Sequence, residues 1–145
     1  MKLKHYILGT MIVIIDQLLK ILMINKDFIL IPNILKFSYV ENINGAFGVG
    51  SKYIVLIFSI IIIVGIIIYL LKENKKINNY NPYILIIFGS IGNLIDRIFR
   101  GYVIDFIDIN ILKFPTFNFS DISIVIGILL LILEITKTNF KIKNR

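Results

Sequence analysis

The chain has 145 residues, of which 57% are hydrophobic and only 17% are charged, and its formal net charge is +7. Because an ordinary soluble domain is about 45–50% apolar and about 25% charged, this composition excludes a water-soluble enzyme, a disordered chain and a fibrous repeat. The positive charge does not by itself indicate a nucleic-acid partner, because basic residues also orient membrane proteins. The chain has no cysteine, and its single histidine, His5, lies near the N-terminus. We therefore expect no metal or other cofactor, and any catalysis would use carboxylates, hydroxyls, amines or amides.

Four segments are apolar and long enough to cross a bilayer, which takes about 20 helical residues. The sequence predicts an all-α integral membrane protein with a single domain over residues 1–145 and spans at about 6–23, 53–71, 82–99 and 121–136. The second span carries no ionisable group and is predicted to face lipid. The first resembles a secretory signal, but Asp16 and Lys20 interrupt its apolar run, so we interpret it as a retained helix.

Basic residues indicate how the spans are oriented. Nine of them fall in the two termini and the middle loop, against five in the other two loops. Because basic segments stay on the cytoplasmic side, both termini are expected in the cytoplasm, and the loops at 24–52 and 100–120 outside it. The first outer loop has partial strand-like alternation and then turn-forming residues, which predicts a small β-rich element on the extracytoplasmic face.

Polar residues at membrane depth are costly and are therefore candidates for function. Asp16 and Lys20 stand four residues apart on the first span and are predicted to form an ion pair. Asn93, Asp96 and Arg97 share one face near the outer end of the third span by the same spacing. For each of these residues the alternative is a purely structural role, as a buried ion pair or an interhelical hydrogen bond.

Two further aspartates lie at the outer boundary of the spans. Asp105 follows the third span among apolar and aromatic residues, and Asp121 begins the fourth span, with Asn118 or Ser120 as its N-cap. The helix dipole alone would explain an acid in a first helical turn, but not Asp105, nor two carboxylates at one depth. Two carboxylates in a partly dry site share one proton, as in aspartic proteases. These two residues are the candidate catalytic pair.

Two other classes of function remain open on these residues alone. The charged residues of the first and third spans would also suit a small ion or proton carrier. A carrier, however, would place its charges near the midplane and often has internal repeats, which this sequence lacks. A scaffold or assembly subunit without chemistry would not need polar residues inside its spans.

Five blocks of sequence follow one another along nearly the whole chain. They are DQLLK at 16–20, VENINGAFG at 40–48, GNLIDR at 92–97, GYVIDF at 101–106 and FPTFNFSDISIVIG at 114–127. Together, in this order and at these spacings, they resemble the bacterial lipoprotein signal peptidase family of four-span aspartic endopeptidases.

The resemblance implies cleavage of diacylglyceryl-modified prolipoproteins just before the lipidated cysteine, at the outer surface of the bacterial cytoplasmic membrane. It gives the catalytic roles to Asp105 and Asp121, although Asp96 also matches a family motif and competes with Asp105. We prefer Asp105, because Asp96 neighbours Arg97 on a helix and is interpreted as its ion-pair partner. The family positions that shape or line the active site match Asp16, Lys20, Asn42, Asn93, Asp96, Arg97 and Asn118.

The same resemblance implies prolipoprotein substrates and membrane lipids as partners, no nucleic acid, and a monomer. The sequence departs from the family pattern in two places. Asn44 and Gly45 stand where the family has glycine and alanine, and Ser120 replaces an alanine. The Ser120 hydroxyl is predicted to bond the neighbouring carboxylate or to cap the helix. The glycine-containing outer loop is expected to close over the substrate as a lid.

Overall fold

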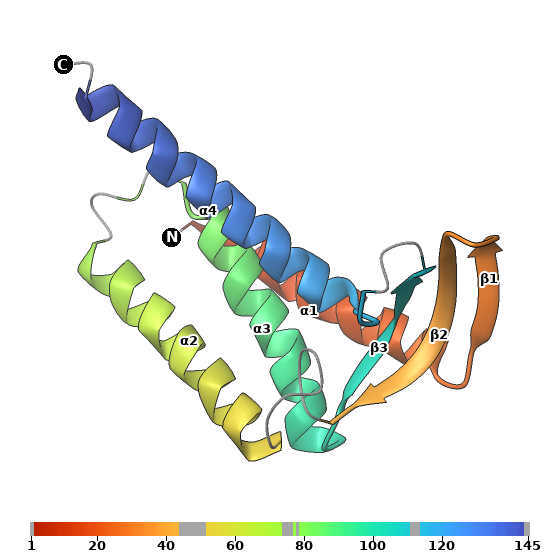
Figure 1. The fold of residues 1–145 in the computed structure, drawn as a ribbon. Helices are drawn as coiled ribbons and strands as arrows, with labels where there is room; N and C mark the ends of the chain where they lie inside the picture. The colour runs from red at the N-terminus through yellow and green to blue at the C-terminus, as the bar shows by residue number, and fades with distance from the viewer. Residues whose placement is uncertain (1, 44–51, 74–76, 78, 111–113, 144–145) are drawn as a thin grey trace.

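The structure, a computed structural model, describes residues 2–43, 52–73, 77, 79–110 and 114–143. The elements, in chain order, are α1 (Leu3–Met23), β1 (Asp27–Ile31), β2 (Leu35–Asn42), α2 (Lys52–Lys72), α3 (Asn81–Phe99), β3 (Val103–Ile109) and α4 (Phe119–Lys143). The helices run along one another and the small sheet lies at one end of them (Figure 1). The departures at Asn44 and Gly45 and the glycines of the expected lid lie outside the described residues.

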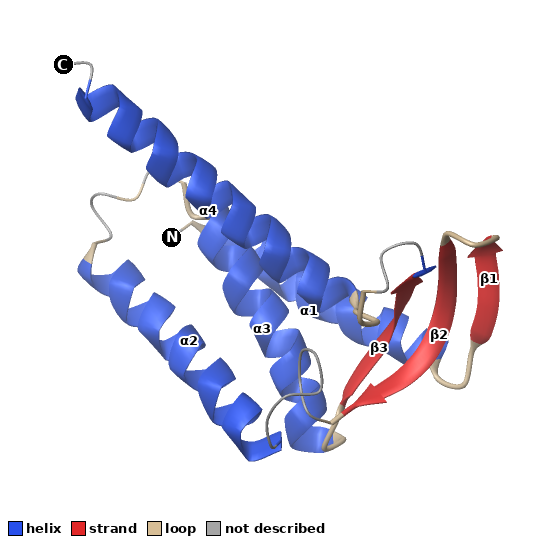
Figure 2. Cartoon of the chain, in the orientation of Figure 1, coloured by secondary structure: helices blue, strands red, loops and turns tan. Residues whose placement is uncertain are grey.

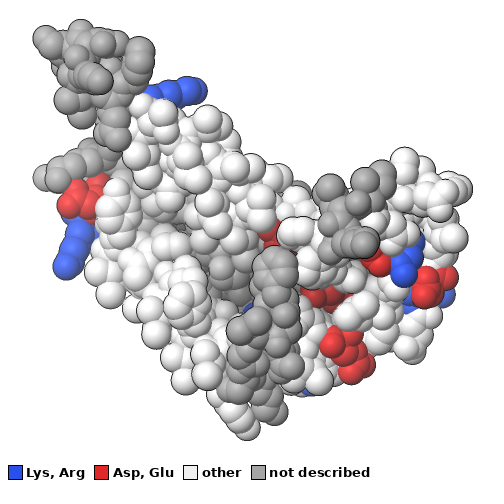
Figure 3. All heavy atoms as spheres, in the orientation of Figure 1, with Lys and Arg blue, Asp and Glu red and all other residues white. Residues whose placement is uncertain are grey.

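The four helices are each long and apolar enough to cross a membrane. In the apolar span of α3, 56% of the residues are buried inside the protein, against 11% in that of α2, so α3 is the inner helix. On the face shown in Figure 3, Lys, Arg, Asp and Glu gather toward the two ends and the helical surface between them is largely uncharged. An exposed apolar surface along helices that are each long enough to cross a bilayer requires lipid around it. The chain is therefore a multi-pass membrane protein.

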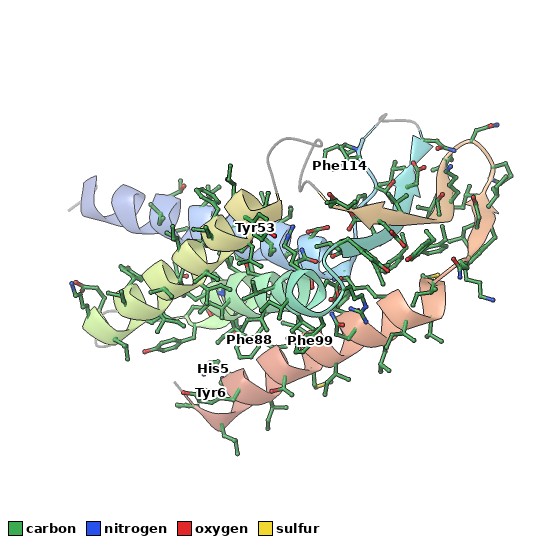
Figure 4. The ribbon with its side chains drawn as sticks, turned by 90° about the horizontal axis from the view of Figure 1, so that it is seen from below. His5, Tyr6, Tyr53, Phe88, Phe99 and Phe114 are labelled. Atoms are coloured by element: carbon green, nitrogen blue, oxygen red, sulfur yellow. The ribbon has the colours of Figure 1, made fainter. Side chains whose placement is uncertain are left out.

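α3 is the central helix, because it contacts α1, α2 and α4, whereas α2 joins the bundle chiefly through α3. Small residues allow these close approaches. A methyl group at Gly89 would lie 2.7 Å from the backbone oxygen of Ser120 in α4, and one at Gly92 would meet the hydroxyl of the same serine. Toward α1, the ring of Phe88 occupies the space that Gly9 leaves open (Figure 4). α1 and α4 therefore both pack closely on α3.

The strands form an antiparallel sheet of three strands in the order β1-β2-β3. The hairpin of β1 and β2 confirms the β-rich element predicted in the first outer loop. β3 adds a strand from the second outer loop, where none was predicted, and the pairs Val40 with Asp105 and Asn42 with Val103 join the two loops. The first half of β3 is buried on both faces, so it lacks the polar and apolar alternation that identifies a half-exposed strand.

The sheet marks one end of the bundle and the chain termini mark the other (Figure 2). α1 and α3 end at the sheet, whereas α2 and α4 begin there. The predicted candidate residues of both outer loops are therefore brought to the same end of the molecule.

Candidate active site

Asn118 lies directly before α4 and caps it. Its Oδ1 accepts a hydrogen bond of 3.0 Å from the backbone N–H of Asp121, and Asp121 Oδ2 accepts one of 3.1 Å from the backbone N–H of Asn118. These reciprocal bonds satisfy N–H groups that the start of a helix leaves unpaired. Of the two predicted caps, Asn118 therefore has this role.

The predictions for the Ser120 hydroxyl are wrong. Ser120 is fully buried, but its Oγ has no hydrogen-bond partner in the described part of the chain. The reason is its position inside the first turn of α4, which directs the hydroxyl at Gly92 of α3 and away from the Asp121 carboxylate. The backbone N–H of Ser120 is used instead, donating a 2.9 Å hydrogen bond to Asp16 Oδ1.

The side chain of Asn118 also joins the two candidate catalytic aspartates. Its Nδ2 donates a 2.6 Å hydrogen bond to Asp105 Oδ1, while its Oδ1 holds the backbone of Asp121. Asp105 is only 2% exposed, and its second oxygen accepts a 2.8 Å hydrogen bond from Asn42 Nδ2 at the end of β2. One side-chain amide therefore links the Asp105 carboxylate on the sheet to the backbone of Asp121 in the first turn of a helix.

The two aspartates influence each other electrostatically. Burial raises the pKa of Asp105 to about 7, the charge of Asp121 adds to this rise, and the N–H donors of Asn42 and Asn118 oppose it. The guanidinium of Arg97 is half-buried and is attracted to both carboxylates. Acids that interact in this way titrate as a pair, and burial together with their mutual repulsion favours the form of the pair that holds one proton.

Asn93 of α3 connects Asp121 to Lys20 of α1. Its Nδ2 donates a 2.7 Å hydrogen bond to Asp121 Oδ1, and its Oδ1 accepts one of 2.9 Å from Lys20 Nζ. Because an ammonium group donates and does not accept, Lys20 fixes the orientation of this amide. The amide nitrogen is thereby directed at the Asp121 carboxylate.

Lys20 is fully buried between two carboxylates. Its Nζ lies 2.8 Å from Asp16 Oδ2 and 2.9 Å from Asp96 Oδ2, so the predicted pair of Asp16 and Lys20 is present. With the bond to Asn93, each of its three N–H groups has an acceptor. A buried ammonium is tolerated only when it is paired and hydrogen-bonded in this way.

The predicted ion pair of Asp96 with Arg97 is wrong. Asp96 pairs with Lys20 and, through Oδ1, with Arg100. Residues four apart share a face of a helix and adjacent residues do not, which explains why Arg100 replaces Arg97. Asp96 Oδ2 also accepts a 3.1 Å hydrogen bond from the backbone N–H of Ile104, which attaches β3 to α3. Both oxygens of Asp96 are thus engaged by donors from the protein.

Two residues of this network were not singled out in the sequence. Gln17 Nε2 donates to Asp96 Oδ1 at 3.0 Å and to the Gly92 carbonyl at 3.1 Å, and its Oε1 accepts a 2.9 Å bond from Arg100. Both carried a signal, because Gln17 is a polar residue inside a span and Arg100 follows Asp96 by four positions.

The candidate residues therefore lie in one connected cluster at the sheet end of the bundle. Arg97 joins it through a 3.4 Å hydrogen bond to the Asn93 carbonyl. The charged side chains pair across α1 and α3 in one layer and do not follow the length of the helices, an arrangement that does not favour a carrier. The connected candidates are Asp16, Lys20, Asn42, Asn93, Asp96, Arg97, Asp105, Asn118 and Asp121.

Comparisons with known proteins agree on one family. The model of the family described as signal peptidase (SPase) II, peptidase family A8, matches residues 8–137. The chain is 36% identical over 135 residues to a lipoprotein signal peptidase of Halothermothrix orenii, covering 88% of this chain and 92% of the relative. It is 42% identical over 143 residues to one of Wigglesworthia glossinidia brevipalpis, covering 91% and 94%.

Solved structures show the same architecture. A bacterial membrane enzyme determined by the in meso method at 2.3 Å resolution matches with a TM-score of 0.79 and 32% identity, over 94% of this chain and 89% of that one. A second, at 1.9 Å resolution, matches with a TM-score of 0.73 and 34% identity, over 91% and 92%. With a matching family model over residues 8–137 and relatives of this similarity, the chain belongs to the signal peptidase II family.

Proposed function

We propose that Asp105 and Asp121 are the catalytic pair of this signal peptidase II. The observation that carries the proposal is the amide of Asn118, which bonds to Asp105 and at the same time to the helical turn that holds Asp121. Asp96 is a weaker candidate, because ammonium, guanidinium, amide and backbone donors already occupy both of its oxygens.

The proposed reaction uses one proton shared by the pair. The ionised carboxylate takes a proton from water while the oxygen of that water attacks the carbonyl carbon of the scissile peptide bond. The protonated carboxyl group donates a hydrogen bond to the carbonyl oxygen and stabilises the tetrahedral intermediate. As the C–N bond breaks, the proton taken from water passes to the leaving amine. The pKa of Asp105, raised to about 7, suits a pair that must hold one proton at neutral pH.

The proposed substrates are diacylglyceryl-modified prolipoproteins, cleaved just before the lipidated cysteine. The relatives named lipoprotein signal peptidases support this substrate class. A lipid-anchored precursor stays in the membrane, and the proposed pair lies where the spans meet the sheet, so the scissile bond need not leave the membrane boundary. Because all the clustered residues come from one chain, we propose that the enzyme works as a monomer in contact with membrane lipids.

The proposed location is the bacterial cytoplasmic membrane, with both termini in the cytoplasm and the active site near the extracytoplasmic face. The distribution of basic residues supports this orientation, since nine of them lie in the termini and the middle loop. The sheet, whose strand β3 carries Asp105, and the start of α4, which carries Asp121, lie at the other end of the bundle (Figure 1).

The test is to express the chain with a lipidated precursor and to measure cleavage per amount of folded enzyme. Asp105→Asn and Asp121→Asn are each expected to leave the precursor uncleaved, and Asp96→Asn to retain cleavage. Asp108→Asn is the matched control, because Asp108 also lies on β3 but is half-buried and pairs with Lys36 at 3.2 Å, away from the cluster. Normal processing by either variant of the pair would contradict the assignment.

A further inference from the structure

The hairpin of β1 and β2 exposes an apolar segment that the proposed chemistry does not use. Phe28, Ile29, Leu30 and Ile31 of β1 are 43%, 68%, 54% and 44% exposed, and Ile34, the last residue of the turn, is 43% exposed. Among the described strands, β1 lies at the edge of the sheet and pairs with β2 alone. In water, an edge of consecutive apolar residues without a charge would pair with other chains. The described part of the chain provides no cover for this segment.

The hairpin projects beyond the side of the helical bundle. Figures 1 and 4 both show it projecting past the outer end of α1. In Figure 1 its turn lies to the side of the bundle, about level with the outer ends of the helices, while the start of β1 lies farther out. The turn is therefore placed near the depth at which the spans leave the membrane.

The apolar surface of the hairpin lies close to the lipid-facing surface of α1. Leu18, Ile21 and Leu22 in the last turns of α1 are 54%, 54% and 63% exposed. Only residues 24–26 separate that helix from β1, and Asn25, with φ 56°, makes the turn between them. The two apolar surfaces are thus close along the chain, and only the polar residues Asn25, Lys26 and Asp27 at the base of the hairpin lie between them.

Polarity also changes along the hairpin. Its base carries the exposed charges of Lys26 and Asp27, and Glu41 is exposed on the neighbouring strand. Its turn end carries Leu30, Ile31 and Ile34, which are all exposed and apolar. Elements with one apolar and one charged end settle at the boundary between headgroups and acyl chains.

We propose that the hairpin is a membrane-docking element whose turn end inserts into the headgroup boundary of the outer leaflet. The sheet is then held from two sides. On one side the hydrogen bond between the Ile104 N–H and Asp96 fixes β3 to α3, and on the other side lipid holds β1. Because Asp105 lies on β3, the lipid boundary helps to set the depth of this carboxylate.

The chain contains no tryptophan, so one substitution introduces a single fluorescent reporter of depth. Leu30→Trp reports on the turn end, and Ile34→Trp repeats the measurement on the other side of the turn. Asp27→Trp is the matched control, because it lies on the same strand at the exposed base. Ile61→Trp, at a position 60% exposed on α2, marks the hydrocarbon region.

Each variant is placed in nanodiscs of phosphatidylethanolamine and phosphatidylglycerol, with one copy per disc and no substrate, after its helix content has been checked by circular dichroism. Leu30→Trp and Ile34→Trp are expected to emit at shorter wavelength than Asp27→Trp. They are also expected to lose more intensity to lipids brominated near the headgroup end of the acyl chain. Asp27→Trp should respond mainly to iodide in the water, and Ile61→Trp to deeply brominated lipids.

Two outcomes would overturn the proposal. One is equal iodide quenching of Leu30→Trp and Asp27→Trp, which would place the whole hairpin in water. The other is shielding of Leu30→Trp that appears only in discs with two copies, which would assign the segment to self-association. Neither outcome depends on peptidase activity.

Discussion

Replacing Lys20 by methionine tests whether the buried charges hold the candidate active site together. Two basic and two acidic side chains form this cluster, and the formal charges of Lys20 and Arg100 balance those of Asp16 and Asp96. The Lys20→Met variant keeps a similar side-chain volume but leaves the cluster with a net charge of −1. In the parent protein Lys20, Asp16 and Asp96 are all 0% exposed, so this unbalanced charge is buried. Removing one partner of a buried pair costs about 3–5 kcal/mol, so we expect a loss of that size in the free energy of unfolding.

A second substitution should recover part of this loss. Asp16→Asn in the Lys20→Met background restores neutrality and keeps an amide oxygen that can accept the Ser120 N–H, which donates at 2.9 Å to Asp16 in the parent. Charges in direct contact are coupled by about 0.5–3 kcal/mol, so the double variant is expected to be more stable than Lys20→Met alone. The assay is equilibrium unfolding in mixed micelles with increasing SDS, followed by far-ultraviolet circular dichroism.

A partly exposed pair in the same protein provides the control. Lys36 lies 3.2 Å from Asp108, and their side chains are 32% and 21% exposed. Ion pairs of this kind contribute about 0–1 kcal/mol, so Lys36→Met should change stability little. A loss of less than about 1 kcal/mol for Lys20→Met, well under the cost of an unpaired buried charge, would refute this reasoning. So would a double variant that is no more stable than Lys20→Met.

Three further predictions concern single side chains. Asn42→Ala removes a hydrogen-bond donor that lowers the pKa of Asp105, so the pair should keep its proton to higher pH. The alkaline limb of the pH profile of kcat/KM, measured on a lipopeptide, should move to higher pH. An unmoved limb, or one at lower pH, would argue against the role of Asn42 as a donor to Asp105. Ser120→Ala deletes a buried hydroxyl without a partner among the described residues, and should raise the unfolding free energy by about 1 kcal/mol; a loss would show that the hydroxyl is bonded. Gly92→Ala places a methyl group 2.7 Å from Asp16 Oδ2 and should cost about 1–3 kcal/mol in the same assay, with unchanged stability as the contrary result.

The spans and the pair of Asp16 and Lys20 were predictable from the sequence because both are local patterns. A membrane-spanning helix is recognised by about 20 consecutive apolar residues. An ion pair between residues four positions apart follows from the geometry of the helix. The same geometry favours Arg100, four residues after Asp96, over the adjacent Arg97, but the prediction named Arg97. In the structure Arg100 also bonds Gln17 of α1, which was not singled out in the sequence.

β3 and its contacts were not predictable in the same way. Val103 to Phe106 are buried on both faces, so they show no alternation, and their pairing partners lie more than 60 residues earlier in β2. The hydrogen bond between Asn42 and Asp105 joins residues 63 positions apart. Such a contact depends on how two loops meet over the bundle, which neither loop encodes separately. The environment of the Ser120 hydroxyl was not predictable for the same reason, because its packing against Gly92 depends on how closely α3 and α4 approach.

The double use of Asn118 makes the site and the first turn of α4 a single cooperative unit. If that turn frays, the hydrogen bond that the Asp121 N–H donates to Asn118 Oδ1 is lost, and with it the fixed amide that reaches Asp105. Local opening of a helix end usually occurs far more readily than global unfolding, yet here it would also dismantle the proposed catalytic pair. Slow hydrogen exchange at the Asp121 amide would accordingly measure the fraction of time in which the enzyme is assembled for reaction.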